Sequence, residues 1–282
     1  MTTDNTEQIA EWNGMQGERW ATLRRETNGI VMPFGEAALA AAAPRTGERV
    51  IDVGCGCGDT SIDLARRVGA SGAVLGVDVS RPMLDVAREL GAQAALPHLT
   101  FSECDASSAA LPGGTDLLYS RFGVMFFADP PAAFAHMRGA LRPGGRCVFA
   151  CWRAPRDNPW MMAPVSAARA ALGITPPPAD PNAPGPFAFA DDGRVRGILQ
   201  AAGFGAVDVK RFDAPVVLGD TPRGAAEAVT RIGPVARLIR EVGAEHAPTI
   251  AAAVEKALAP FAAPGGRVTL QGSAWIVTAA NP

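Results

Sequence analysis

The sequence predicts an α/β protein built on a largely parallel β-sheet. From Arg49 onward, short β-rich runs alternate with segments of helix length, which is typical of βαβ units. The first run, residues 50–53, leads through a glycine-rich loop into a helix that begins near Asp59. Hydrophobic residues make up 48% and charged residues 19% of the 282 residues, a globular balance that excludes a disordered or fibrous chain.

The predicted elements follow one another in a regular order. Strands are expected at 50–53, 73–79, 99–104, 116–120 and 146–152, then near 206–212 and at 267–278. Helices are expected at 7–20 and 35–43 before the first strand, and between the strands thereafter. Proline-dense or helical stretches interrupt this regularity after the fifth strand. We therefore predict one domain with a helical N-terminal cap (1–45), a core (46–154), substrate-side lid insertions (155–190 and 220–264) and sheet completion (191–219 and 265–282).

Charge and cysteine content narrow the possible partners and location. With 26 basic and 28 acidic residues the net charge is -2, so the chain lacks the positive field of a non-specific nucleic-acid binder, and no nucleic-acid partner is expected. The five cysteines are an odd number behind a polar, acidic N-terminus, which favours a reduced cytoplasmic protein. The sequence contains no uninterrupted apolar run of about 20 residues, so no membrane span is expected. The Cys55-Gly56-Cys57 spacing does not match a zinc site, so no metal is expected.

The loop after the first strand predicts a ligand site. Gly54, Gly56 and Gly58 alternate between a strand and a helix, where missing side chains let a ligand approach the backbone. Asp78 ends the second strand, where a carboxylate can accept hydrogen bonds from both ribose hydroxyls. Together these features indicate an adenosine-containing ligand.

The residue after Gly58 helps to choose between adenosine ligands. A dinucleotide fingerprint has its final glycine where this chain has Asp59, and an acid there would repel a pyrophosphate. Asp59 suits an amino-acid tail better, and a plain helix N-cap is its alternative role.

Four ordered motifs resemble those of class I S-adenosylmethionine-dependent methyltransferases, and most closely the branch with the ubiquinone and menaquinone biosynthesis enzymes. The motifs are residues 51–58, 76–80 with Met83, 104–106 and 141–145, and the resemblance covers residues 49–152. It implies a Rossmann-like seven-stranded sheet, S-adenosylmethionine as the cofactor and methyl transfer by direct in-line displacement.

The resemblance also implies roles for individual residues. Gly54, Gly56 and Gly58 would line the methionine and ribose part of the cofactor. Asp52 would reach its amino group, and Asp78 would hold the ribose. Asp105 would accept the adenine amino hydrogen beside the backbone of Ala106, and Met83 would contact the adenine. Val79 would belong to the cofactor site, and Ser120 and Arg121 would present backbone to the methionine amino group. Met83 could equally be a core residue of its helix.

A cationic sulfonium favours aromatic faces, for which Trp12, Trp20, Phe122 and Phe126 are candidates. A hydrophobic staple explains Trp12 and Trp20 equally well.

No residue stands out as a general base, and His246 is the better of the weak candidates. Arg121 or Arg153 could hold an acidic substrate or form a surface salt bridge.

The acceptor is expected to be a small molecule. Apolar residues of the first insertion could contact an aromatic or prenyl-like substrate, namely Trp152, Trp160, Met161 and Met162. Two alternatives stay open: a nicotinamide-dependent oxidoreductase, and a non-catalytic module that binds S-adenosylmethionine. The acceptor atom and the oligomeric state, monomer or homodimer, are also open.

Overall fold

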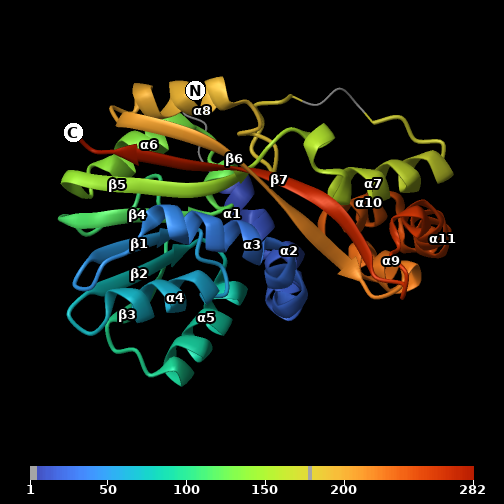
Figure 1. The fold of residues 1–282 in the computed structure, drawn as a ribbon, viewed down its shortest axis with the longest axis horizontal. Helices are drawn as coiled ribbons and strands as arrows, with labels where there is room; N and C mark the ends of the chain where they lie inside the picture. Colours follow the sequence, from blue (N-terminus) through green and yellow to red (C-terminus); the bar gives the residue numbers. More distant parts are fainter. Residues whose placement is uncertain (1–4, 177–179) are drawn as a thin grey trace.

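The computed structural model, which describes residues 5–176 and 180–282, contains a seven-stranded sheet in the order β3-β2-β1-β4-β5-β7-β6 (Figure 1). β1 to β5 are mutually parallel where they pair, and β7 runs antiparallel to both of its neighbours. The strands are β1 (Arg49–Val53), β2 (Ala73–Asp78), β3 (Leu99–Glu103), β4 (Thr115–Arg121), β5 (Leu141–Trp152), β6 (Gly205–Gly219) and β7 (Val268–Ala280). This confirms the predicted α/β class and the number of strands.

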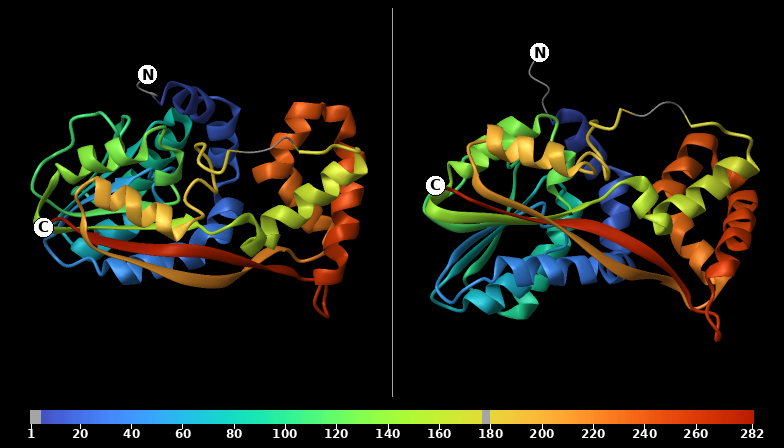
Figure 2. Two further views of the ribbon diagram at one scale, coloured as in Figure 1. Left: turned by 90° about the horizontal axis from the view of Figure 1, so that it is seen from above. Right: turned by 45° about the horizontal axis from the view of Figure 1, so that its top comes forward.

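Helices cover both faces of the sheet, so its central strands are buried over most of their length. α3 (Arg24–Ala42), α4 (Asp59–Val68) and α5 (Arg81–Ala94) lie on one face, and α6 (Pro130–Arg138) and α8 (Asp192–Ala201) lie on the other (Figures 1 and 2). Four of the five residues of β1 and five of the seven of β4 are buried. The hydrophobic core therefore continues through the sheet, and the carboxyl ends of the parallel strands meet at one edge.

Local sequence explains where several helices begin. Pro82 lies in the first turn of α5, where its missing N–H has no intrahelical partner to lose. The Asp129 side chain accepts a hydrogen bond from the backbone of Ala132 at the start of α6, and Asp191 caps α8 in the same way.

The N-terminal helices differ from their predicted bounds. The expected helix 7–20 is divided at Gly14, whose extended backbone separates α1 (Thr6–Asn13) from α2 (Met15–Thr22). The expected helix 35–43 is only the end of α3, which continues through Pro33. Burial of Ile30 and Phe34 against the sheet outweighs the hydrogen bond that Pro33 cannot make.

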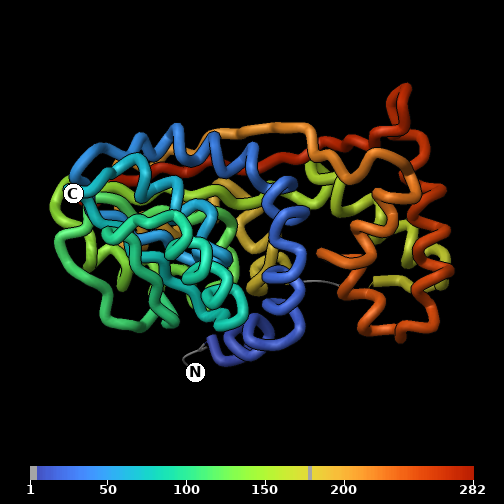
Figure 3. The backbone as a smooth tube through the Cα atoms, turned by 90° about the horizontal axis from the view of Figure 1, so that it is seen from below, coloured from blue at the N-terminus to red at the C-terminus, as the bar shows by residue number. Residues whose placement is uncertain are grey.

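The residues of the two predicted insertions come together in a helical module at the far end of β6 and β7. The module consists of α7 (Pro159–Ala171), α9 (Pro222–Arg231), α10 (Gly233–Val242) and α11 (Ala247–Leu258), with the short helices η3 (Ala244–His246) and η4 (Ala259–Phe261). β6 and β7 stay paired from Gly205 to Gly219 and carry the chain out to it (Figures 1 and 3). η2 (Pro155–Asp157) links β5 to α7.

In the part of the chain that the structure describes, no helix is both long and apolar enough to cross a bilayer. The prediction that no membrane-spanning helix is present agrees with this finding.

Candidate cofactor site

The loop between β1 and α4 takes a backbone course that only glycines adopt without strain. Gly54 and Gly58 have φ of 67° and 82°, in the left-handed region. A Cβ on Gly54 would lie 2.7 Å from the Cα of Gly123, at the end of β4. A Cβ on Gly58 would lie 2.9 Å from both Ala87 on α5 and the ring of Phe101 on β3. The loop is thus shaped by close approach to its surroundings on both sides.

Asp52 on β1 is a fully buried carboxylate with an unused oxygen. Its Oδ2 accepts hydrogen bonds from the hydroxyls of Thr60, at 2.8 Å, and Ser61, at 2.6 Å, both on α4. Its Oδ1 is buried and has no hydrogen-bond partner among the described residues. Burial raises the pKa of Asp52 to about 6, against the opposing effect of the two hydroxyls. This acid is therefore prepared to accept a donor, and a cationic donor would favour its charged form.

Asp78, at the end of β2, holds the glycine loop from the other side. Its Oδ2 accepts a hydrogen bond from the backbone N–H of Gly56 at 2.8 Å, and its Oδ1 accepts one from Ser80 at 2.8 Å. The residue is 8% exposed, and burial raises its pKa. Asp52 and Asp78 form no ion pair with any residue that the structure describes, although the positive charge of Arg121 partly offsets the rise in the pKa of Asp52.

Asp105, which follows β3, is held by the N-terminal cap. The side-chain Nδ2 of Asn5 donates to Asp105 Oδ1 at 3.0 Å and Oδ2 at 2.9 Å, and to Ser107 Oγ at 3.1 Å. The backbone N–H of Ser107 also donates to Asp105 Oδ1, at 2.9 Å. Asn5 Oδ1 in turn accepts a hydrogen bond from the backbone N–H of Ala128 at 2.8 Å. Asn5 therefore bridges two loops at the carboxyl edge of the sheet.

The cap makes further contacts with the end of β2. Ser80 Oγ donates to the carbonyl of Trp12 at 2.7 Å, and Asn13 Nδ2 donates to the carbonyl of Val79 at 2.7 Å. Asn13 Oδ1 accepts from the backbone N–H of Arg81 at 3.0 Å. A Cβ on Gly17 would come within 2.5 Å of Ser80 Oγ, so this glycine allows α2 to lie close to α5.

The four aromatic candidates separate into two groups. The ring centre of Trp12 lies 5.9 Å from that of Trp20 and 5.3 Å from that of Phe126, so these two cap residues and Phe126 form one group. Phe122 stacks on Trp152 at 4.0 Å, in a second group with Phe34. Phe122 has a φ of 63°, rare for a bulky residue, at the β4 end where the glycine loop approaches.

Other predicted cofactor residues line the same edge through their backbone or their packing. Met83 is buried, and its sulfur would lie 3.7 Å from a Cβ on Gly56. Ala106 is buried beside Asp105. The Ser120 hydroxyl donates to the carbonyl of Val53 at 2.7 Å, and it accepts from the backbone N–H of Gly123 at 3.2 Å, so it joins the ends of β1 and β4.

The Arg121 side chain points toward α3. Its Nη1 donates to Asn28 Oδ1 at 2.7 Å, and its Cδ would lie 2.6 Å from a Cβ on Gly35. There it lines a groove of about 350 Å³ between α3 and α4. The Arg121 side chain thus lies in the groove between α3 and α4, from where its positive charge opposes the rise in the pKa of Asp52.

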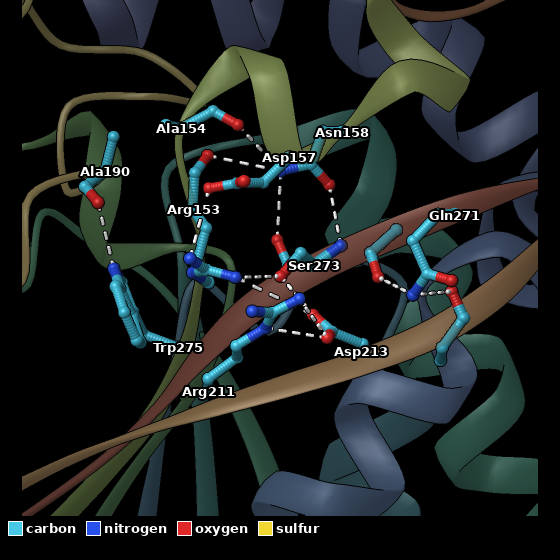
Figure 4. A network of polar contacts seen from close by, with 12 residues as sticks. Arg153, Ala154, Asp157, Asn158, Ala190, Arg211, Asp213, Gln271, Ser273 and Trp275 are labelled. Carbon is cyan, nitrogen blue, oxygen red and sulfur yellow. Dashed lines mark hydrogen bonds and ion pairs between the residues drawn. The ribbon is translucent and has the colours of Figure 1, made fainter.

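Arg153 is enclosed in a polar network where β5, β6 and β7 leave the sheet (Figure 4). Its guanidinium lies 3.2 Å from Asp157 and 3.7 Å from Asp213, donates to Ser273 Oγ at 2.8 Å, and lies 4.5 Å from the ring centre of Trp275. These contacts give Arg153 a structural role at the base of the helical module.

His246 is in η3 on the helical module. Its side chain is 44% exposed, and Glu245 lies 4.0 Å away. The structure does not bring His246 together with the glycine loop.

Asp59 forms a two-point ion pair with Arg24 of α3, one contact being 2.9 Å from Arg24 Nε to Asp59 Oδ2. Because Arg24 compensates its charge, Asp59 does not itself oppose a phosphate. Asp52 and Asp78 have no such ion pair, so it is their buried negative charges that would disfavour a pyrophosphate at the loop.

The cysteines do not form a metal site in the described ranges. No group of three or more histidine, cysteine or acidic side chains there could hold an ion. All five cysteines are free thiols, and burial raises the pKa of Cys57 and of Cys147 to about 12.

Comparisons with known proteins agree with this architecture. Residues 50–145 match the family described as a methyltransferase domain. An aklanonic acid methyltransferase of Streptomyces sp. (strain C5) is 33% identical over 118 residues, which are 42% of this chain and 54% of that protein. A ubiquinone/menaquinone biosynthesis C-methyltransferase of Cellvibrio japonicus is 32% identical over 134 residues, 47% of this chain and 54% of that protein.

A solved structure extends the likeness in fold. The YcgJ protein of Bacillus subtilis superposes with a TM-score of 0.59 at 16% identity, over 89% of this chain and 98% of that one. The chain spans about half the length of the curated relatives it matches. The motifs and these matches support the predicted class I S-adenosylmethionine-dependent methyltransferase, with the family match itself confined to residues 50–145.

Sequence reasoning missed the cap residues that contact the site. Asn5 directly precedes α1 and Asn13 ends it, both near other polar residues, and nothing close to them in the sequence links them to Asp105 or Val79. Thr60 and Ser61 could have been found, because they lie in the first turn of the helix after the loop, facing the strand that holds Asp52.

Proposed function

We propose that this protein transfers a methyl group from S-adenosylmethionine to a small-molecule acceptor. The observation that carries the proposal is the pair of buried carboxylates, Asp52 and Asp78, which lie on either side of the glycine loop and form no ion pair with the described residues. A ligand with an ammonium group and a neutral ribose fits them. A dinucleotide would bring a pyrophosphate toward two buried acids and is disfavoured.

Each acid has a distinct part in holding the cofactor. Asp52 would accept the ammonium group through Oδ1, the oxygen that has no partner. Asp78 would hold the ribose hydroxyls, exchanging the backbone donors that it now accepts from Gly56 or Ser80. Asp105 would accept the adenine amino group beside the buried Ala106. The glycine loop would let the ligand approach its backbone closely.

When bound, the cofactor supplies a methyl group activated by a sulfonium. The protein's task is then to align an acceptor behind that methyl and to exclude water, and alignment alone is worth up to about 7 to 11 kcal/mol in favourable systems. Trp12 and Phe126 present aromatic surface near the carboxyl edge, where they would stabilise the positive sulfur. We assign no general base, because the structure does not bring His246 together with the glycine loop and an arginine side chain has no acceptor for a proton.

The acceptor that we propose is an apolar or aromatic small molecule. Phe122, directly after β4, stacks on Trp152 at the end of β5, and Trp160 lies 5.4 Å from Trp152; these largely buried rings would give an acceptor site between the glycine loop and the helical module an apolar lining. The relatives named for aklanonic acid and for ubiquinone/menaquinone biosynthesis support this choice of acceptor class. We further propose a cytoplasmic enzyme, monomeric or homodimeric, with no nucleic-acid partner; its free thiols and net charge of -2 support this.

Isothermal titration with S-adenosylmethionine, S-adenosylhomocysteine and a nicotinamide dinucleotide tests the proposal. We expect the two sulfur ligands to bind and the dinucleotide not to bind. Asp78→Ala should weaken their binding at least tenfold through loss of the ribose contacts, whereas Asp85→Ala, an exposed acid on α5, should leave it unchanged. Binding of the dinucleotide alone, or an unchanged affinity in Asp78→Ala, would overturn the assignment.

A further inference from the structure

The contact between Asn5 and Asp105 has the hydrogen-bonding pattern of a bound adenine. A primary amide presents an NH2 donor next to a carbonyl acceptor. The adenine edge likewise presents its amino group next to a ring-nitrogen acceptor. In this structure the Asn5 NH2 donates to both oxygens of Asp105, and its carbonyl accepts from the backbone N–H of Ala128.

The carboxylate that Asn5 holds is the one assigned to the adenine amino group. The Asn5 NH2 also reaches Ser107, and Ser107 N–H occupies a further position on Asp105 Oδ1. An incoming amino group must therefore share or displace donors that already satisfy this carboxylate. Because Asn5 is joined to Ala128 as well, its displacement frees a contact on the opposite loop.

We propose that Asn5 is an internal competitor of the cofactor: its side-chain amide occupies the adenine-recognition group of Asp105 and must leave before the nucleoside binds. The inference rests on the proposed function, since it requires Asp105 to bind adenine. Asn5 is the residue immediately before α1, so its departure releases the start of the cap from the site. The remaining contacts of the cap, from Asn13 and Trp12 to the end of β2, tether it while it opens.

The test compares the affinity and association rate of S-adenosylhomocysteine for the unaltered protein and for Asn5→Ala. Removal of the competing amide should tighten binding about tenfold, the scale of one hydrogen bond to a charged group, chiefly through faster association. In a protein that already carries Asp105→Ala, the same Asn5 substitution should change the affinity by less than about twofold, because the carboxylate for which Asn5 and the adenine compete is absent.

Asn13→Ala is the matched control for simple loosening of the cap. It removes two contacts between cap and core without touching Asp105, and we expect less than about a twofold gain in affinity. An equal gain in Asn13→Ala, or an unchanged or weaker affinity in Asn5→Ala, would overturn the proposal while leaving the cofactor assignment intact. Failure of both the unaltered protein and Asn5→Ala to bind S-adenosylhomocysteine would instead overturn the proposed function, and this inference with it.

Discussion

Asp52 is a buried carboxylate that lowers the stability of the folded chain in the pH range where it can bind a cation. Its pKa is raised from 3.8 to about 6 because burial disfavours the ion. Well below pH 4 the acid is protonated in both the folded and unfolded states. As the pH rises toward 6, only the unfolded chain ionises freely, so the free energy of unfolding falls by about 3 kcal/mol.

Asp52→Asn should therefore stabilise the protein at pH 8, by up to about 3 kcal/mol, and have little effect near pH 4. Asparagine keeps an oxygen that can accept from Thr60 and Ser61 but removes the buried charge. Urea unfolding at the two pH values measures the difference. Asp213→Asn serves as a contrast, because the side-chain hydrogen bond from Arg211 lowers the pKa of Asp213, so this variant should lose stability above pH 4. A destabilised Asp52→Asn at pH 8 would contradict this account of the site.

The same charge predicts how cofactor affinity depends on pH. An ammonium group is held by the ionised form of Asp52, so affinity for S-adenosylhomocysteine should fall as the pH drops below about 6. The fall should approach tenfold per pH unit and should be absent in Asp52→Asn, which binds weakly throughout. Titration calorimetry from pH 5 to pH 8 gives both curves; a flat profile for the unaltered protein would show that Asp52 does not meet the ammonium.

At the scale of elements, the glycine loop depends on the strand that lies beside it. Gly54 has a left-handed backbone and lies against Gly123 of the β4 end, so the courses of the two loops are coupled. Sequence alone predicted the loop from its glycine spacing. It could not predict Gly123 as a partner, since that contact depends on the pairing of β1 with β4 across more than sixty residues of chain.

Gly54→Ala should cost about 1 to 3 kcal/mol of stability and weaken cofactor binding, because its Cβ meets backbone that cannot move away. Gly197→Ala, inside α8 where nothing lies within 4 Å of an added Cβ, should instead gain about 0.5 to 1 kcal/mol. Chemical denaturation compares the two. If Gly54→Ala were as stable as the unaltered protein, the loop would not be constrained as described.

At the scale of the whole molecule, one buried asparagine joins the sheet to the helical module. Asn158, at the start of α7, is fully buried, and its side chain bonds to both the N–H and the carbonyl of Ser273 on β7 and to the carbonyls of Arg153 and Ala154 (Figure 4). Removal of that side chain would take a hydrogen-bond partner from several buried backbone groups at the point where β6 and β7 leave the core, although the Ser273 carbonyl would still accept from the Arg153 N–H.

Asn158→Ala should lower stability by about 2 to 3 kcal/mol and raise hydrogen exchange in α7 and in β7 near Ser273. Affinity for S-adenosylhomocysteine should change little, because the acids of the cofactor site lie on other strands. Asn182→Ala, an exposed position, is the control for a surface asparagine. Unaltered exchange in α7 would show that the network does not hold the module.

Features of the fold that follow from local sequence pattern could be predicted. Contacts between residues far apart in the chain could not. The βαβ alternation and the motifs at 51–58 and 76–80 gave the α/β class and the seven-stranded sheet. The assembly of α7 with α9, α10 and α11 could not be predicted, because alanine-rich helices carry no signal for their partners. The hydrogen bond between Asn5 and Asp105 joins residues 100 positions apart, and no local sequence pattern predicts it.

A crystal structure of the complex with S-adenosylhomocysteine tests the central claim most directly. The account predicts the ligand ammonium on Asp52 Oδ1, the ribose hydroxyls on Asp78, and the adenine amino group on Asp105 with Asn5 withdrawn. A ligand bound elsewhere, or bound at this edge without contact to Asp52 and Asp78, would contradict it.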